Sequence, residues 1–299
     1  MVANILTSRI MTDLLGGITS GVVIGLVALS LVLVWQSTNV LNFAQGAMAM
    51  FATYVGMTQL NHNLNFWLCV LISVLVGFLF GAITERVLVR PLYGKAEINP
   101  IVVMVGFLSL LEAVASSIWS SVPRFLTPPF STTYFQNGGS PTGLSPFALF
   151  QIVAAFFVMA LVALLFRYTN LGLQLRAAAL APEVARLLGV RVGRLLTLGW
   201  ALSTAVGAVA AIVISTGDAG LFPANMESVF IAGFIAAAIG GLESPAGALL
   251  AGVVIGVIMQ FINDYLNSGY AGFVGVILLV ISLLIRPQGL FSKSTQRRV

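Results

Sequence analysis

Long apolar segments follow one another along nearly the whole chain, separated by short polar connections. A helix needs about 20 mostly apolar residues to cross the hydrocarbon core of a bilayer, and its backbone hydrogen bonds must then be satisfied internally. Hydrophobic residues make up 59% of the 299 residues and charged residues only 8%, whereas soluble domains carry roughly 25% charged residues. The sequence therefore predicts an all-α fold, a polytopic bundle of transmembrane helices.

Nine apolar segments are expected to build this bundle, as a single transmembrane domain over residues 1–299. Roughly eight to ten crossings are expected, because short or glycine-interrupted segments can be re-entrant instead of spanning. The first segment is expected to be retained, since no small-residue cleavage pattern follows it. The predicted segments are 15–35, 44–60, 66–89, 100–121, 146–166, 195–215, 228–242, 246–263 and 270–285.

The basic residues indicate which face of the bundle is cytoplasmic. Lys and Arg are enriched in cytoplasmic loops, and here they gather in three connections whose positions allow them to share one face. The connection 122–144, rich in Pro, Gly, Ser and Thr, is expected to be an extracytoplasmic loop that cannot span. The side of the N-terminus is left open, and no nucleic-acid partner is expected. The clustered residues are Arg86, Arg90, Lys95, Arg167, Arg176, Arg186, Arg191, Arg194, Arg286, Lys293, Arg297 and Arg298.

The segment 168–195 interrupts the apolar pattern and contains the signals of a short amphipathic helix. Pro182 suits the first turn of a helix, and Gly189 suits the left-handed residue that ends one. Between them, Val184, Leu187 and Leu188 share one side, with Glu183 and Arg186 elsewhere. Such a helix either seals a loop against lipid headgroups or docks into a groove on a soluble partner.

Five motifs in the same order resemble those of the H-type permease of branched-chain amino-acid ABC importers. Within the third motif, Glu183, Ala185 and Gly189 match the E-A-A-x-x-x-G loop of ABC-importer permeases. Gln45 replaces a usual His, and Glu243 replaces a usual Gly. The motifs are NVLNFAQGAMAMFATYV (39–55), ERVLVRPLYG (85–94), RAAALAPEVARLLGVRVGRL (176–195), GFIAAAIGGLESPAGALLAGVVIG (233–256) and RPQGLF (286–291).

This resemblance implies a subunit of a larger transporter in the bacterial inner membrane. The implied partners are ABC ATPase subunits, a second permease chain of the paralogous M type, an extracytoplasmic solute-binding protein and membrane lipid. The chain lacks the phosphate-binding G-x-x-x-x-G-K-[ST] loop, so it is expected to be no enzyme and to bind no cofactor, with ATP used by the partner. The resemblance implies that the coupling contact consists of Glu183, Ala185, Arg186, Leu187, Leu188 and Gly189.

Polar residues and glycines within the apolar segments are candidates for the translocation pathway. Asn39, Asn42 and Gln45 precede Gly46, which permits close backbone approach; these polar groups either line the pathway or form hydrogen bonds between helices. Gly240 and Gly241 mark a second broken segment, and paired broken segments often flank a midplane site. Glu112 lies deep in an apolar segment, as a structural hydrogen-bonding group or a proton relay.

The residues are also compatible with a second function. A self-contained secondary transporter or channel for a small solute, such as urea or an amide, would share the same composition and the same broken segments. A metal site has little support, because His62 is the single histidine and neither H-E-x-x-H nor a cysteine cluster is present.

Overall fold

The computed structural model describes residues 2–58, 65–96, 98–137, 140–141, 144–217, 220–286 and 289–291. Its architecture confirms the predicted all-α class. A two-residue antiparallel hairpin, β1 (Gln136–Asn137) and β2 (Ser140–Pro141), lies in a long connection. The helical elements are α1 (Val2–Thr38), α2 (Gln45–Thr58), α3 (Phe66–Thr84), the π-helical turn η2 (Glu85–Val89), the 3-10 turn η3 (Arg90–Leu92), α4 (Ile98–Trp119), α5 (Pro146–Tyr168), α6 (Asn170–Leu180), α7 (Pro182–Leu187), α8 (Val192–Ser215), α9 (Pro223–Gly240), α10 (Pro245–Tyr265) and α11 (Ser268–Ile285).

Each of the nine predicted apolar segments corresponds to a helix, with two departures from the expected pattern. Helix α1 starts at Val2, well before the predicted start at residue 15, because the helix continues through residues 2–14, in which apolar and polar residues alternate irregularly. Helix α6 was not predicted at all. Its N-terminus is capped by Thr169, whose hydroxyl accepts a hydrogen bond from the Gly172 backbone N–H.

Six helices in the described part of the chain are long and apolar enough to cross a membrane: α1, α3 with its following turns, α4, α5, α8 and α10. Helices α9 and α11 are shorter apolar helices. Helix α2 has 14 residues and is therefore about 21 Å long, less than a hydrocarbon core of about 30 Å. Because α2 is almost entirely buried, it is enclosed by protein. The polytopic bundle and the mixture of full-length and short segments are thus as expected.

Helices α1 and α8 form the centre of the bundle. In the most apolar windows of α1 and α8, 78% and 72% of the residues are buried, against 17% in both α4 and α5. The peripheral helices therefore present most of their apolar surface to lipid or to another chain.

Glycines spaced by four residues, Gly21 with Gly25 in α1 and Gly77 with Gly81 in α3, bring helix backbones together. A Cβ added at Gly21 of α1 would lie 2.7 Å from the Val253 Cα of α10. On α3, a Cβ at Gly77 would lie 3.0 Å from the Thr204 carbonyl oxygen of α8. Such small residues permit close helix packing in membranes, so α1 with α10 and α3 with α8 form tight pairs.

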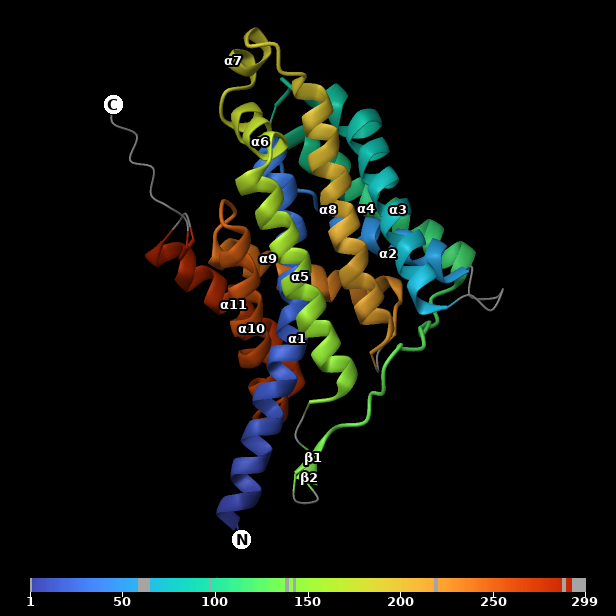
Figure 1. The fold of residues 1–299 in the computed structure, drawn as a ribbon, viewed down its shortest axis with the longest axis vertical. Coiled ribbons are helices and arrows are strands. Elements are labelled where there is room, and N and C mark those ends of the chain that lie inside the picture. The colour runs from blue at the N-terminus through green and yellow to red at the C-terminus, as the bar shows by residue number, and fades with distance from the viewer. Residues whose placement is uncertain are drawn as a thin grey trace.

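Figure 1 shows that the bundle has two distinct ends. The turns after α3, helices α6 and α7, and the start of α8 lie uppermost, and the end of α5 leads into α6. We name this the basic end after basic residues of these segments and of the connection after η3: Arg86, Arg90, Lys95, Arg167, Arg186, Arg191 and Arg194. The N-terminus and the β1–β2 hairpin lie at the opposite end. Lys293, Arg297 and Arg298 lie outside the described residues.

The predicted loop 122–144 crosses the opposite end without forming a helix in its described parts. Arg124 pairs with Leu221 through two backbone hydrogen bonds of 3.0 and 2.9 Å, and the Leu126 backbone N–H donates to the Ser215 carbonyl at 2.9 Å. These bonds hold the loop against the connection between α8 and α9.

Candidate coupling site and its polar joint

A sharp reversal after α5 projects the predicted coupling segment from the bundle. The Thr169 hydroxyl donates to the Leu165 carbonyl at 2.6 Å and accepts from the Gly172 N–H at 3.1 Å. A Cβ added at Gly172 would lie 2.5 Å from the Phe166 Cα. Glycine at this position therefore lets α6 fold back tightly on the end of α5, and α7 follows at the tip of the molecule (Figure 1).

The ends of α7 follow the local signals that predicted them. Pro182 occupies its first turn. At the other end Gly189 has a φ of 81°, its N–H donates to the Arg186 carbonyl at 3.0 Å, and the Val190 N–H donates to the Ala185 carbonyl at 3.0 Å. These two bonds form a Schellman motif, which uses a left-handed residue to satisfy the last carbonyls of a helix.

Helix α7 carries an exposed apolar ridge, which we define as Val184, Leu187 and Leu188. These side chains are 55%, 88% and 78% exposed. Glu183, Arg186 and Gly189 are also exposed. Ala185 differs from the other predicted coupling residues, because it is 3% exposed and packs in a buried cluster with Val192 and Leu195 of α8. Ala185 therefore packs α7 against the bundle.

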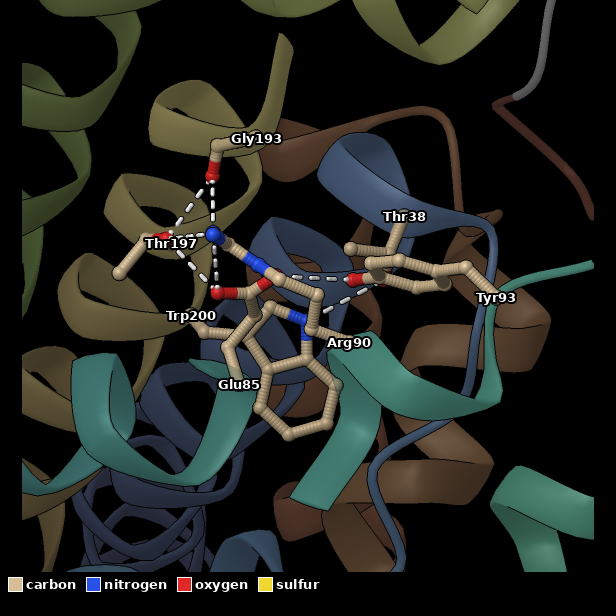
Figure 2. Close-up of polar contacts among 7 residues, drawn as sticks. All are labelled: Thr38, Glu85, Arg90, Tyr93, Gly193, Thr197 and Trp200. Carbon is tan, nitrogen blue, oxygen red and sulfur yellow. Dashed lines mark hydrogen bonds and ion pairs between the residues drawn. The ribbon is translucent and has the colours of Figure 1, made fainter. Parts of the chain in front are cut away.

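The start of α8 is held to the end of α3 by a cluster of polar contacts, shown in Figure 2, which we name the polar joint. The Arg90 guanidinium donates to both Glu85 carboxylate oxygens, through Nε to Oε1 at 3.3 Å and through Nη2 to Oε2 at 3.0 Å. Arg90 Nη2 also contacts the Gly193 carbonyl at 2.6 Å and Thr197 Oγ1 at 2.7 Å. Thr197 Oγ1 in turn lies 2.7 Å from Glu85 Oε2. Charge-assisted bonds of this kind are stronger than neutral ones.

An irregular turn places the two charged residues of the joint together. The Arg90 backbone N–H donates to the Glu85 carbonyl, the five-residue spacing of a π-helical turn. Single π-helical turns within α-helices frequently mark functional sites. Pro91 follows in η3, where its lack of an N–H ends the regular pattern.

Because the polar joint is largely buried, loss of any one of its hydrogen-bond partners is expected to destabilise it. The Glu85 side chain is fully buried and the Arg90 side chain is 37% exposed. The Tyr93 hydroxyl donates to Glu85 Oε1 at 3.4 Å, and burial, together with the neighbouring carboxylate, raises the pKa of Tyr93 well above its ordinary value. Trp200 Nε1 donates to Thr38 Oγ1 at 3.3 Å, which links the same region of α8 to the end of α1.

The candidate pathway residues at the start of α2 are buried and hydrogen-bonded. Asn42 and Gln45 are each 1% exposed. Asn42 Nδ2 donates to Gln45 Oε1 at 2.9 Å, and Gln45 Nε2 donates to the Ser203 carbonyl of α8 at 3.1 Å. This arrangement is the interhelical hydrogen bonding that the sequence allows as one alternative; a role in the pathway stays a prediction.

The other candidate pathway residues are dispersed. Asn39 is exposed at the end of α1 with a φ of 53°, and a Cβ at Gly46 would lie 3.1 Å from the Phe230 Cβ of α9. Gly240 and Gly241 lie at the other end of α9, where the Phe291 N–H donates to the Gly240 carbonyl at 3.3 Å. Glu112 is half-buried on α4. The structure thus joins Asn42 with Gln45, which directly precedes Gly46, whereas Gly240 and Gly241 lie at the end of α9 and Glu112 lies on α4.

Residues 14–283 match the family described as the branched-chain amino acid transport system permease component. The chain belongs to this family. The permease is 26% identical to the high-affinity branched-chain amino acid transport system permease protein BraD of Pseudomonas aeruginosa, over 96% of this chain and 97% of that protein. It is 30% identical to a branched-chain amino acid transport permease protein, LivH, of Methanocaldococcus jannaschii, over 89% and 87% of the two chains.

Two further similarities are to a relative named for a different substrate and to a solved structure. The permease is 23% identical to the fructose import permease protein FruF of Bifidobacterium longum, over 84% of this chain and 71% of that protein. Its fold is similar to that of a chain in PsaBC from Streptococcus pneumoniae in complex with Fab, with a TM-score of 0.53 and 14% identity over 96% and 97% of the two chains. The last similarity describes the fold alone.

The polar joint was not predicted as a site, although its signal was available in the permease sequence. Glu85 and Arg90 both belong to the motif ERVLVRPLYG, which carries part of the family resemblance, and Arg90 is also one of the basic residues that indicate the cytoplasmic face. An acid and a base at the end of an apolar segment, followed by a proline, indicate a buried ion pair near an irregular turn. Thr197 carries no such signal, because it lies 112 residues from Glu85.

Proposed function

We propose that this permease is the membrane subunit of an ABC importer that moves branched-chain or related hydrophobic amino acids inward. ATP is hydrolysed by partner subunits that dock on α7, and the permease itself binds no cofactor. The protein resides in the bacterial inner membrane with its basic end in the cytoplasm, and the enrichment of Lys and Arg in cytoplasmic loops supports this orientation. Membership of the family supports the substrate class, and the geometry of α7 supports the source of energy.

The exposed apolar ridge of α7 is the observation that carries this proposal. Leu187 and Leu188 are 88% and 78% exposed at the tip of the basic end. Complete burial of one leucine side chain stabilises a complex by about 2 kcal/mol, so a groove that covers both supplies a substantial part of a docking energy. Amphipathic helices that insert an apolar face into a groove are a recurring mode of protein recognition.

The remaining partners are assigned by position. Helices α4 and α5 bury only 17% of the residues in their most apolar windows, and a second permease chain of the M type covers part of this surface. The solute-binding protein docks at the opposite end, where the loop 122–144 is held in place by the backbone pairing of Arg124 with Leu221. Substrate then passes toward the basic end as the permease pair alternates between outward-open and inward-open packings.

Reconstitution of the purified complex tests this proposal. The permease is isolated with its associated subunits, placed in liposomes with its solute-binding protein, and assayed for uptake of leucine, isoleucine and valine with and without ATP. ATP-dependent uptake of these amino acids supports the proposal. Uptake of fructose in their place contradicts the substrate class, and gradient-driven uptake of urea or an amide by the permease alone establishes the secondary-transport alternative.

A further inference from the structure

Helices α3 and α8 are packed so closely that they form one mechanical unit. A Cβ added at Gly77 would lie 3.0 Å from the Thr204 carbonyl, and one added at Gly81 would lie 2.7 Å from Thr204 Oγ1. Because packed interiors have few voids and low compressibility, such backbone contact resists sliding of one helix past the other.

The polar joint extends this contact to the basic end. Arg90 Nη2 reaches the Gly193 carbonyl at 2.6 Å and Thr197 Oγ1 at 2.7 Å, and Thr197 Oγ1 is 2.7 Å from Glu85 Oε2. Each of these contacts crosses from the turns after α3 to the first two turns of α8. Apolar side chains in this place would allow several nearly equivalent packings, whereas directional hydrogen bonds specify one register.

The turns of α8 that the polar joint contacts follow shortly after α7 in the chain. Helix α7 ends at Leu187, Gly189 and Val190 close its Schellman motif, and α8 begins at Val192. With so short a connection, a displacement of α7 acts first on the start of α8.

We propose that Glu85, Arg90 and Thr197 are positioning residues for energy coupling. They lock the start of α8 to the end of α3, so that a movement of α7 displaces both helices together. This inference rests on the proposed function, because it requires an ATPase docked at α7. The same motion reaches the buried network at the start of α2, since Gln45 Nε2 donates to the Ser203 carbonyl, six residues after Thr197 on α8.

A substitution that removes one hydroxyl tests the proposal without altering charge. Thr197→Val removes the atom shared by Arg90 and Glu85, whereas Thr197→Ser keeps it. Thr216→Val is the matched control, because the Thr216 hydroxyl donates to the Val213 carbonyl at 2.6 Å, at the far end of α8 from the polar joint. The measured quantity is the number of ATP molecules hydrolysed per amino acid imported, in liposomes that contain the complete transporter.

Thr197→Val is expected to raise this ratio about threefold to tenfold, as loss of a hydrogen bond to a charged group shifts an equilibrium by at least that much. Thr197→Ser and Thr216→Val are expected to keep the ratio of the unmodified protein. An unchanged ratio in Thr197→Val overturns the inference. If the unmodified transporter shows no ATP-dependent uptake, the proposed function itself has failed instead.

A distance measurement keeps the proposal testable if Thr197→Val fails to assemble. Spin labels are placed on the exposed Val87 and Arg194 of the otherwise unmodified transporter, in a Cys69→Ser background. The joint requires that the distance between these labels stays the same with and without ATP, while α7 moves relative to α1. A nucleotide-dependent change in the distance between Val87 and Arg194 overturns the inference.

Discussion

Arg90 contacts Glu85 twice, once through its backbone and once through its side chain. Its backbone N–H donates to the Glu85 carbonyl across the π-helical turn, and its guanidinium donates to the Glu85 carboxylate at 3.3 and 3.0 Å. The backbone bond fixes the spacing, and the two side-chain bonds fix the direction of the guanidinium. Arg90 therefore presents Nη2 to the start of α8 in a single orientation.

Loss of Glu85 alone is expected to cost more than loss of the whole ion pair. Glu85→Leu leaves Arg90 partly buried without its counter-charge, and we expect the free energy of unfolding to fall by about 2 kcal/mol, less than for a fully buried pair because Arg90 is 37% exposed. Glu85→Leu with Arg90→Met removes both charges and is expected to lose less. Denaturant unfolding in detergent micelles measures both; equal losses in the single and double variants would contradict the assignment.

Tyr93 predicts a specific loss of stability at alkaline pH. Its pKa is raised by burial and by the Glu85 carboxylate, so the folded state holds the phenol proton more tightly than the unfolded state. The stability that Tyr93 contributes is fully present below the pKa of about 10 that a tyrosine has in the unfolded state. It is lost as the pH rises toward the pKa of Tyr93 in the folded state. Between pH 8 and 11, the unmodified permease should therefore lose more stability than Tyr93→Phe, and parallel pH profiles would disprove the effect.

Gly189 is expected to be required for the shape of α7. Its φ of 81° costs a side-chain-bearing residue about 1–2 kcal/mol. Gly189→Ala should thus weaken retention of the ATPase about fivefold or more. Gly106→Ala serves as the control, since Gly106 has a helical backbone and nothing lies within 4 Å of an added Cβ. Affinity is measured by titrating the purified ATPase onto immobilised permease; equal binding by both variants would show that this turn is dispensable.

Glu112 is expected to be structural. A single intramembrane acid most often bonds a neighbouring helix or a water-lined surface, although it can also mark a proton relay. Uptake by Glu112→Gln is therefore expected to match that of the unmodified transporter at every pH from 5.5 to 8, within roughly a factor of two. Loss of a proton-gradient-driven component in this variant would favour the secondary-transport alternative.

The bounds of α7 could be predicted from sequence because both signals are local. Pro182 acts in the first turn of the helix and Gly189 in the residue after its cap, and each needs only its immediate backbone. The nine apolar segments were predictable for a similar reason, since length and composition suffice for a helix in lipid.

The polar joint depends on contacts between residues that are far apart in the chain, whereas the signals for α6 are local. The start of α6 is marked by its Thr169 cap and by the close approach of Gly172 to Phe166, and neither feature is part of the apolar pattern that predicts the spans. Thr197 is one of several hydroxyl-bearing residues on α8, and only the fold brings it within 2.7 Å of Glu85, 112 residues earlier in the chain. The burial of Asn42 and Gln45 likewise follows from the position of α8 against α2.

The central claim is that energy enters the permease through the apolar ridge of α7. Its most direct test is the amount of ATPase that remains bound to detergent-purified permease when Leu187 and Leu188, 88% and 78% exposed, are both replaced by Ser. Leu266→Ser is the matched control, because Leu266 is 70% exposed at the opposite end, after α10. We predict at least about a tenfold loss of bound ATPase for the α7 variant, since each leucine contributes about 2 kcal/mol when buried, and no loss for the control. Full retention of the ATPase by the α7 variant would contradict the account.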